Sequence, residues 1–232
     1  ATSLTDERLR HRIELEEWYH RYLHHKNEGL HQRALYFTDN VVIAAPADDA
    51  APIEPVRMAE SLLLGASTYV VGLAVEAGLA YRGAMSIGPV FVDERAVDHD
   101  LADVHMAHGS GLVDAVVLEE TVARVPRVVI DDRVLAEITS ELAGTRLPIF
   151  TPTILRDDSD GTIFLAHLGM QLGFEPNLDV GRPSHSTGMS RVELLERYRE
   201  FVLAGLAEPP KVREKYLWLA AYYNWTIERF GI

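Results

Sequence analysis

The chain contains no cysteine, no long uninterrupted hydrophobic stretch and few basic residues. No disulfide can form, and 232 residues bury enough apolar surface to fold without one. The lack of cysteine fits a reducing cytoplasm and equally a secreted protein without disulfides. The longest apolar stretch, residues 62–75, is too short to span a bilayer, and we expect it to form a buried helix. No signal-like segment opens the chain, which favours a cytoplasmic protein.

Acidic residues dominate the charge, with 35 Asp and Glu against 22 Lys and Arg, a formal net charge of −13. A surface of this sign repels phosphate backbones and anionic membranes, so we expect no nucleic-acid partner and no membrane partner. A nucleotide that binds together with a divalent cation is still compatible with this charge, because the cation supplies the missing positive charge. The 47% hydrophobic and 25% charged composition is typical of one or two globular domains.

Hydrophobic patterning along the first part of the chain predicts alternating helices and strands. We expect an amphipathic helix over 4–27, then a hairpin in which the apolar runs QRALYF and VVIAAP flank the turn pair Asp39-Asn40. A buried helix over 57–78 should end at Gly78. The elements expected next are two strands broken at Gly88-Pro89, a glycine-led helix in HGSGLVDAVVLEE, a strand in PRVVID and a helix over 133–142.

The pattern changes from Leu147 onward. The apolar runs LPIFTPTILR and TIFLAHL flank a turn at 158–161, and two helices follow. Ser190 and Glu193 are spaced as a capping box for the first of these helices. The second should run over 210–230 and carries a band of aromatic residues. The order of elements predicts one α+β domain with a C-terminal helical extension.

Asp39 is the first candidate for chemistry, because a carboxylate at the tip of a rigid hairpin suits a hard metal ion. The alternative is that Asp and Asn are favoured turn residues for their local hydrogen bonds. The pairs His24-His25 and His105 with His108 lack a recognised zinc spacing, so we interpret them as solvated polar residues.

Two further candidates could meet an anion. Ser110 lies in a Gly-Ser-Gly segment at an expected helix start, where backbone N–H groups can hold a phosphate or where Ser110 acts as an ordinary N-cap. Arg82 precedes Gly83 in an expected strand and needs a buried carboxylate or an anionic substrate as partner. No P-loop, GxSxG elbow, dinucleotide fingerprint or HExxH motif is present, which removes the usual NTPase, hydrolase, dehydrogenase and zincin interpretations.

Taken in order, the segments ALYFTDNVVIAAP, AYRGAMSIGPVFVDE, HGSGLVDAVVLEE and PRVVIDD resemble class III nucleotidyl cyclases. They are most similar to the pyrimidine cyclases of bacterial Pycsar anti-phage systems, which carry a hairpin aspartate, then RGA, then a Gly-led helix ending in LE. RDDSDG before IFLAHL, and VREKYLWLAAYYN, resemble the tail of that subfamily. The resemblance runs from about residue 34 to 226, and it is weaker between 168 and 210.

The resemblance implies a ferredoxin-like antiparallel sheet with helices on one face. Residues 1–145 would form the cyclase-like domain without its first strand, and residues 146–232 would form a hairpin and C-terminal helices packed on the same domain. Such enzymes convert UTP or CTP to the 3′,5′-cyclic monophosphate, here an antiviral second messenger, and release pyrophosphate. The resemblance also implies two Mn²⁺ or Mg²⁺ ions per site and a homodimer with sites at the interface.

The resemblance also implies roles for four residues. Asp39 matches the metal-binding hairpin aspartate, and Arg82 matches the arginine of RGA and is expected to support catalysis. Tyr36 lies on the strand where purine cyclases place a base-selecting lysine, so it is a candidate for substrate binding. Ser110 begins the helix that contributes across the dimer and is the second substrate-binding candidate.

Two departures from the family pattern favour an alternative. Nothing before residue 34 matches the strand that carries the family's first metal aspartate. Val116 stands where the subfamily usually has Tyr and other class III enzymes have Asn. The alternative is a catalytically degenerate cyclase-homology protein that binds a nucleotide or a partner without turnover. A third interpretation is a structural dimerisation domain with an ordinary turn at Asp39.

Overall fold

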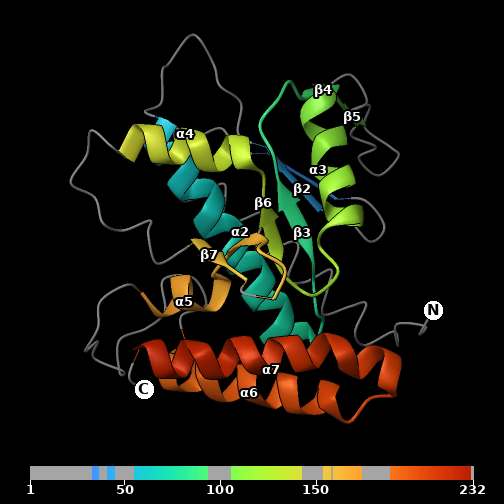
Figure 1. Ribbon diagram of the computed structural model, residues 1–232, viewed down its shortest axis with the longest axis vertical. Helices are drawn as coiled ribbons and strands as arrows, with labels where there is room; N and C mark the ends of the chain where they lie inside the picture. Colours follow the sequence, from blue (N-terminus) through green and yellow to red (C-terminus); the bar gives the residue numbers. More distant parts are fainter. Residues whose placement is uncertain are drawn as a thin grey trace, which may run out of the picture.

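The computed structural model describes residues 33–36, 41–44, 55–93, 106–142, 154–157, 159–173 and 189–230 (Figure 1). Its elements, in chain order, are β1 (Arg33–Tyr36), β2 (Val41–Ala44), α2 (Pro55–Ala77), β3 (Gly83–Met85), β4 (Phe91–Asp93), β5 (Met106–His108), α3 (Ser110–Thr121), β6 (Val128–Ile130), α4 (Asp132–Leu142), β7 (Ile154–Arg156), β8 (Ile163–Leu165), α5 (His167–Leu172), α6 (Arg191–Leu206) and α7 (Pro210–Phe230).

A four-stranded sheet has the order β3-β6-β8-β7. β3 and β6 are parallel, whereas β8 runs antiparallel to both β6 and β7. β6 is central and its three β-branched residues are all buried, as expected for a strand covered on both faces. The α+β class is therefore confirmed. The described sheet is mixed, whereas the resemblance implies an antiparallel one, so the specific cyclase arrangement stays a prediction.

Two further pairs of strands form separate two-stranded sheets, β1-β2 and β4-β5. The predicted first hairpin is confirmed, because β1 and β2 are antiparallel and Tyr36 pairs with Val41. The strands β3 and β4 lie on either side of Gly88-Pro89, as predicted. The strand β5 was not expected from the sequence. The helix predicted over 4–27 and the turn residues Asp39-Asn40 lie outside the described residues.

α2 is the buried helix that its apolar sequence predicts. Leu63, Val71 and Leu73 are fully buried, and the helix packs on α4, α5 and α6. Gly78 ends the helix with φ 63°, a conformation that glycine adopts without steric cost. The N–H of Leu79 then donates to the carbonyl of Leu73 at 3.0 Å, which satisfies one of the last carbonyls of the helix.

α5 is a short helix whose six residues are all buried. Several of its polar groups have internal partners: the Gln171 amide donates to the Ser67 hydroxyl at 2.8 Å, and that hydroxyl donates to the His167 carbonyl at 2.7 Å. The Tyr222 hydroxyl accepts the Leu168 N–H at 2.9 Å. No sequence pattern predicts this helix, because its residues continue the apolar run of β8.

α6 and α7 form an antiparallel helical pair at one end of the molecule (Figure 1). The Ser190 hydroxyl accepts the Glu193 N–H at 3.2 Å, so the predicted N-cap of α6 is confirmed. The two helices approach closely where Gly205 meets the ring of Tyr216. Among the helices that the structure describes, none combines the length and apolar character needed to cross a membrane.

Candidate functional site

The start of α3 is seated directly on the turn between β3 and β4. A Cβ atom on Gly88 would lie 2.8 Å from the Cα of Gly111, and one on Gly111 would lie 2.7 Å from the Gly88 carbonyl oxygen. Gly109 has φ 140° and touches the Pro89 carbonyl so closely that a side chain would collide with it. Three glycines therefore allow backbone to pack on backbone, and α3 begins in a fixed place.

Hydrogen bonds also join the start of α3 to the turn between β3 and β4. The Gly111 N–H donates to the Pro89 carbonyl at 3.1 Å, and the Ser86 hydroxyl donates to the Gly111 carbonyl. The N-cap position of α3 is Gly109 and makes no side-chain capping hydrogen bond. Ser110 is the first helical residue and is exposed, so the interpretation of Ser110 as an ordinary N-cap is wrong.

The other end of α3 is held by Arg82. Its side chain forms an ion pair with Glu119 and approaches the Ala123 carbonyl at 3.5 Å. Arg82 lies just before β3 and about half of its side chain is exposed, whereas Glu119 is more buried. A cation at a helix C-terminus also interacts favourably with the helix dipole. Arg82 thus has the carboxylate partner that its position required.

A second arginine, Arg133, joins α3 to the start of α4. Its guanidinium lies 2.7 Å from the Asp114 carboxylate and 2.8 Å from the Asp131 carboxylate. Asp131 also accepts the Arg133 backbone N–H at 2.8 Å. The hydrogen bond from Arg133 lowers the pKa of Asp131, against the opposing effect of its burial. The Asp131 N–H donates to the Met85 carbonyl at 3.0 Å, so this cluster sits where β3 and β6 end.

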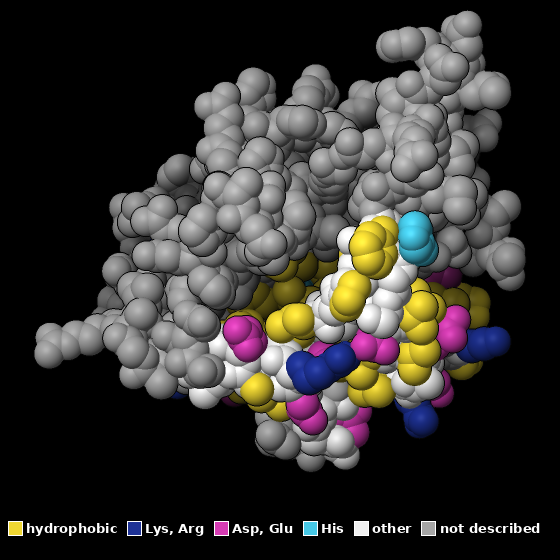
Figure 2. All heavy atoms as spheres, turned by 90° about the horizontal axis from the view of Figure 1, so that it is seen from above, with side chains coloured by type: hydrophobic (Ala, Val, Ile, Leu, Met, Phe, Trp, Pro, Cys, Tyr) yellow, Lys and Arg dark blue, Asp and Glu magenta, His cyan; other side chains and the backbone are white. Residues whose placement is uncertain are grey.

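The outer face of α3 is apolar and exposed. Val113, Val116 and Val117 follow helical i, i+3, i+4 spacing, and about half of each is accessible to solvent. Ile87 and Phe91 are likewise exposed, and Phe91 stacks on His108 with the ring centroids 5.5 Å apart. Figure 2 looks onto this end of the molecule, where hydrophobic side chains lie among acidic and basic ones.

The structure places the predicted site residues in different surroundings. Ser110 and Arg82 lie at opposite ends of α3. Tyr36 is the last residue of β1, whose sheet is separate from the four-stranded one. Asp39 lies outside the described residues. The described part of the chain holds no group of three or more His, Asp or Glu side chains that could bind a metal ion, so the metal ligands stay a prediction.

Sequence reasoning identified neither the Arg82–Glu119 ion pair nor the cluster that Arg133 forms with Asp114 and Asp131. Glu119 belongs to the LE ending of the resemblance, but nothing in the sequence pairs it with Arg82, 37 positions earlier. The Asp131-Arg133 spacing was the one available signal, because an Asp two residues before a helical N–H is a common cap.

The arrangement rigidly fixes a helix with a glycine-rich start and an apolar outer face. Such a helix can present the exposed Ser110 to an anion and its outer face to another protein surface. Comparison of the chain with protein-family models, with curated proteins and with solved structures found no match.

Proposed function

We propose that this protein is a pyrimidine nucleotide cyclase, which converts UTP or CTP to the 3′,5′-cyclic monophosphate and pyrophosphate as an antiviral second messenger. The observation that carries the proposal is the Arg82–Glu119 ion pair. It joins the arginine of RGA to the glutamate of the LE ending, two motifs that are separate in the resemblance. Residues that share one function are expected to meet in the fold, and these two do.

The glycine contacts support the same proposal from the other end of α3. The SIGP turn after RGA and the HGSG start of the helix pack through Gly88 and Gly111. All three features of the resemblance (RGA, the glycine-led start and LE) therefore belong to one rigid unit. In this proposal Arg82 supports the site by fixing α3, and the exposed Ser110 faces the triphosphate.

The apolar face of α3 supports a homodimer. The resemblance places this helix across a dimer interface, and Val113, Val116 and Val117 expose an apolar stripe there. An exposed stripe of this kind, rimmed by polar residues, is typical of a protein–protein contact. In the proposed reaction the ribose 3′-oxygen attacks the α-phosphorus and pyrophosphate leaves. The Mn²⁺ or Mg²⁺ ions and their ligand Asp39 are assigned by resemblance alone.

A second candidate function is binding of a nucleoside triphosphate without turnover. Val116 favours it, because an exposed valine cannot supply the hydrogen bond that Tyr or Asn would make at this position. The same fold would then act through binding alone.

One experiment separates the two candidates. The purified chain is incubated with Mn²⁺ or Mg²⁺ and with UTP, CTP, ATP or GTP in turn, and products are identified by mass spectrometry. We expect cyclic UMP or cyclic CMP with pyrophosphate, lost in Asp39→Asn and retained in Asp132→Asn, a substitution of an exposed residue of α4. No cyclic product from any triphosphate would refute the cyclase. Triphosphate binding that persists in Asp39→Asn, measured by calorimetry, would then support the second candidate.

A further inference from the structure

Arg127, immediately before β6, is buried beneath the β7–β8 hairpin. Only 1% of its side chain is exposed. One guanidinium nitrogen donates to Asp157 at 2.7 Å, and the other donates to Asp160 at 2.5 Å and to the Thr162 hydroxyl at 3.0 Å. A buried guanidinium requires compensating charge, and two carboxylates from one hairpin turn supply it. Its Nε has no hydrogen-bond partner among the described residues.

Asp157 lies at the centre of this cluster. Its Oδ2 accepts hydrogen bonds from Arg127 and from the Trp218 indole N–H, at 2.7 Å and 2.8 Å. Its Oδ1 accepts the N–H and the hydroxyl of Ser159. Burial alone would raise the pKa of Asp157, but the hydrogen bonds from Ser159 and Trp218 outweigh burial and hold the pKa below its ordinary value. Each oxygen of Asp157 therefore accepts two hydrogen bonds. Oδ2 binds both Trp218 of α7 and Arg127 of the loop before β6, so it joins these two segments.

The same arginine reaches the end of α3. The second guanidinium nitrogen of Arg127 lies 3.4 Å from the carbonyl of Val122, the C-cap residue of α3. The next carbonyl, that of Ala123, is the one that Arg82 approaches. Two arginines thus contact the carbonyls of the two residues that directly follow α3, and Arg127 is in turn held by Asp157. An unbroken set of polar contacts leads from Trp218 through Asp157 and Arg127 to Val122.

We propose that Asp157 couples the C-terminal helices to α3, so that Trp218, Asp157 and Arg127 are positioning residues for the helix on which the proposed site is built. This inference deepens the proposed function and rests on it for the meaning of α3. The residues come from RDDSDG, from VREKYLWLAAYYN and from PRVVIDD. The coupling gives the C-terminal extension a role in the site, because α7 then fixes where α3 ends.

The alternative is that the cluster only stabilises the fold. The two roles predict different sites of faster amide exchange when the cluster is weakened. A general loss of stability changes amide exchange at all slowly exchanging sites together, whereas coupling changes exchange at the end of α3 first. The informative amides are those of Val122 and Ala123, which donate to Leu118 and Glu119 at 2.9 Å and 3.2 Å. The Val113 amide, which donates to Gly109 at 3.1 Å, reports on the start of the same helix.

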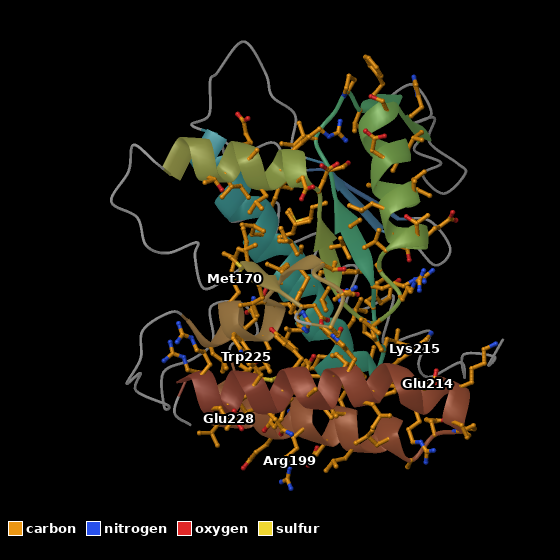
Figure 3. The ribbon with its side chains drawn as sticks, viewed as in Figure 1. Met170, Arg199, Glu214, Lys215, Trp225 and Glu228 are labelled. Atoms are coloured by element: carbon orange, nitrogen blue, oxygen red, sulfur yellow. The ribbon has the colours of Figure 1, made fainter. Side chains whose placement is uncertain are left out.

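The test is amide hydrogen exchange of the full chain and of Trp218→Phe, which keeps an aromatic ring against Phe164 and Tyr222 but removes the indole donor. The matched control is Trp225→Phe, a substitution of the other indole that stacks on Tyr222; Trp225 lies on α7 and is labelled in Figure 3. We expect exchange at Val122 and Ala123 to be about fivefold faster in Trp218→Phe, the factor given by one lost hydrogen bond. We expect the exchange rate of the Val113 amide to be unchanged in Trp218→Phe. In the control variant Trp225→Phe we expect the exchange rates of all three amides to be unchanged.

A second variant, Asp160→Asn, tests the same coupling if Trp218→Phe does not fold. Asp160→Asn alters a partly exposed carboxylate and weakens the hold on Arg127, while the Trp218–Asp157 contact stays in place. Selective acceleration at Val122 and Ala123 is expected here too. Uniform acceleration at all three amides, or unchanged exchange at the end of α3, would overturn the coupling. Because exchange needs no substrate, the result decides the coupling whether or not the chain forms a cyclic nucleotide, so failure of the two proposals can be told apart.

Discussion

Acid should destabilise the fold through His167, the buried histidine at the start of α5. Its side chain is inaccessible to solvent, and its Nε2 lies 2.9 Å from the Tyr198 hydroxyl. Nδ1 has no hydrogen-bond partner within the described ranges. Burial lowers the pKa of His167 to about 4, against an opposing backbone interaction with Leu165. Tyr198 and Tyr222, whose rings contact the imidazole, stay neutral because burial raises the pKa of both.

The size of the effect follows from proton linkage. An unfolded histidine has a pKa of about 6.5, so between that pH and 4 the unfolded chain binds a proton that the folded chain does not. The stability is therefore complete above about pH 6.5 and falls as the pH drops toward 4. Each pH unit within this window removes about 1.4 kcal/mol, which gives a loss of about 2 kcal/mol between pH 7 and pH 5. Asp131, Asp157 and Asp160, with their lowered pKa values, lose their contribution only at lower pH.

The assay is the free energy of unfolding in urea, measured at several pH values across this window. His167→Gln, which cannot be protonated, should abolish most of the dependence on pH. His108→Gln, a substitution of an exposed histidine on β5, should leave it in place. A dependence that is equally steep in His167→Gln, or absent from the unmodified chain, would refute the reasoning.

Two further substitutions test the surroundings of α3. Gly109→Ala should lower the free energy of unfolding in a urea titration by more than about 2 kcal/mol, because Gly109 has a positive φ and a side chain there would collide with the Pro89 carbonyl. Gly78→Ala should cost only about 1 kcal/mol, because Gly78 has a positive φ but open space around it, and equal costs for the two variants would contradict the close packing at Gly109. Val117→Lys should convert the proposed dimer to a monomer in sedimentation velocity, whereas Leu203→Lys, at an equally exposed position on α6, should not. If the unmodified chain is a monomer at all concentrations, the proposed dimer is refuted.

Local patterns predicted most of the described elements, because each depends on neighbours in the sequence. The α2 helix follows from an apolar stretch and a glycine stop, and the β7–β8 hairpin from two apolar runs around a turn. The sequence did not predict α5, because its six residues are all buried. A short helix that is buried on all sides has the same apolar sequence pattern as a buried strand. The parallel pairing of β3 with β6 is a long-range property, and no local signal specifies it.

The site was predictable only in part, for the same reason. The glycines at the start of α3 were visible as a motif, but the packing of Gly88 on Gly111 joins segments 23 residues apart. Arg127 reads in the sequence as an ordinary surface residue before a strand. Its burial depends on carboxylates that lie 30 and 33 positions later in the chain. Polar clusters of this kind are set by topology, which residue types alone do not reveal.

The attachments of α3 differ on each of its sides, and the difference bears on what the helix does. Its start is fixed by glycine backbone contacts, its end by Arg82 and Arg127, and one flank by Arg133. The outer face, with three exposed valines, has none of these attachments. An exposed apolar stripe beside polar residues is typical of a surface that contacts another protein. Rigid anchoring at three places together with an apolar fourth side is what an interface helix requires, because a fixed surface loses little entropy when a partner binds.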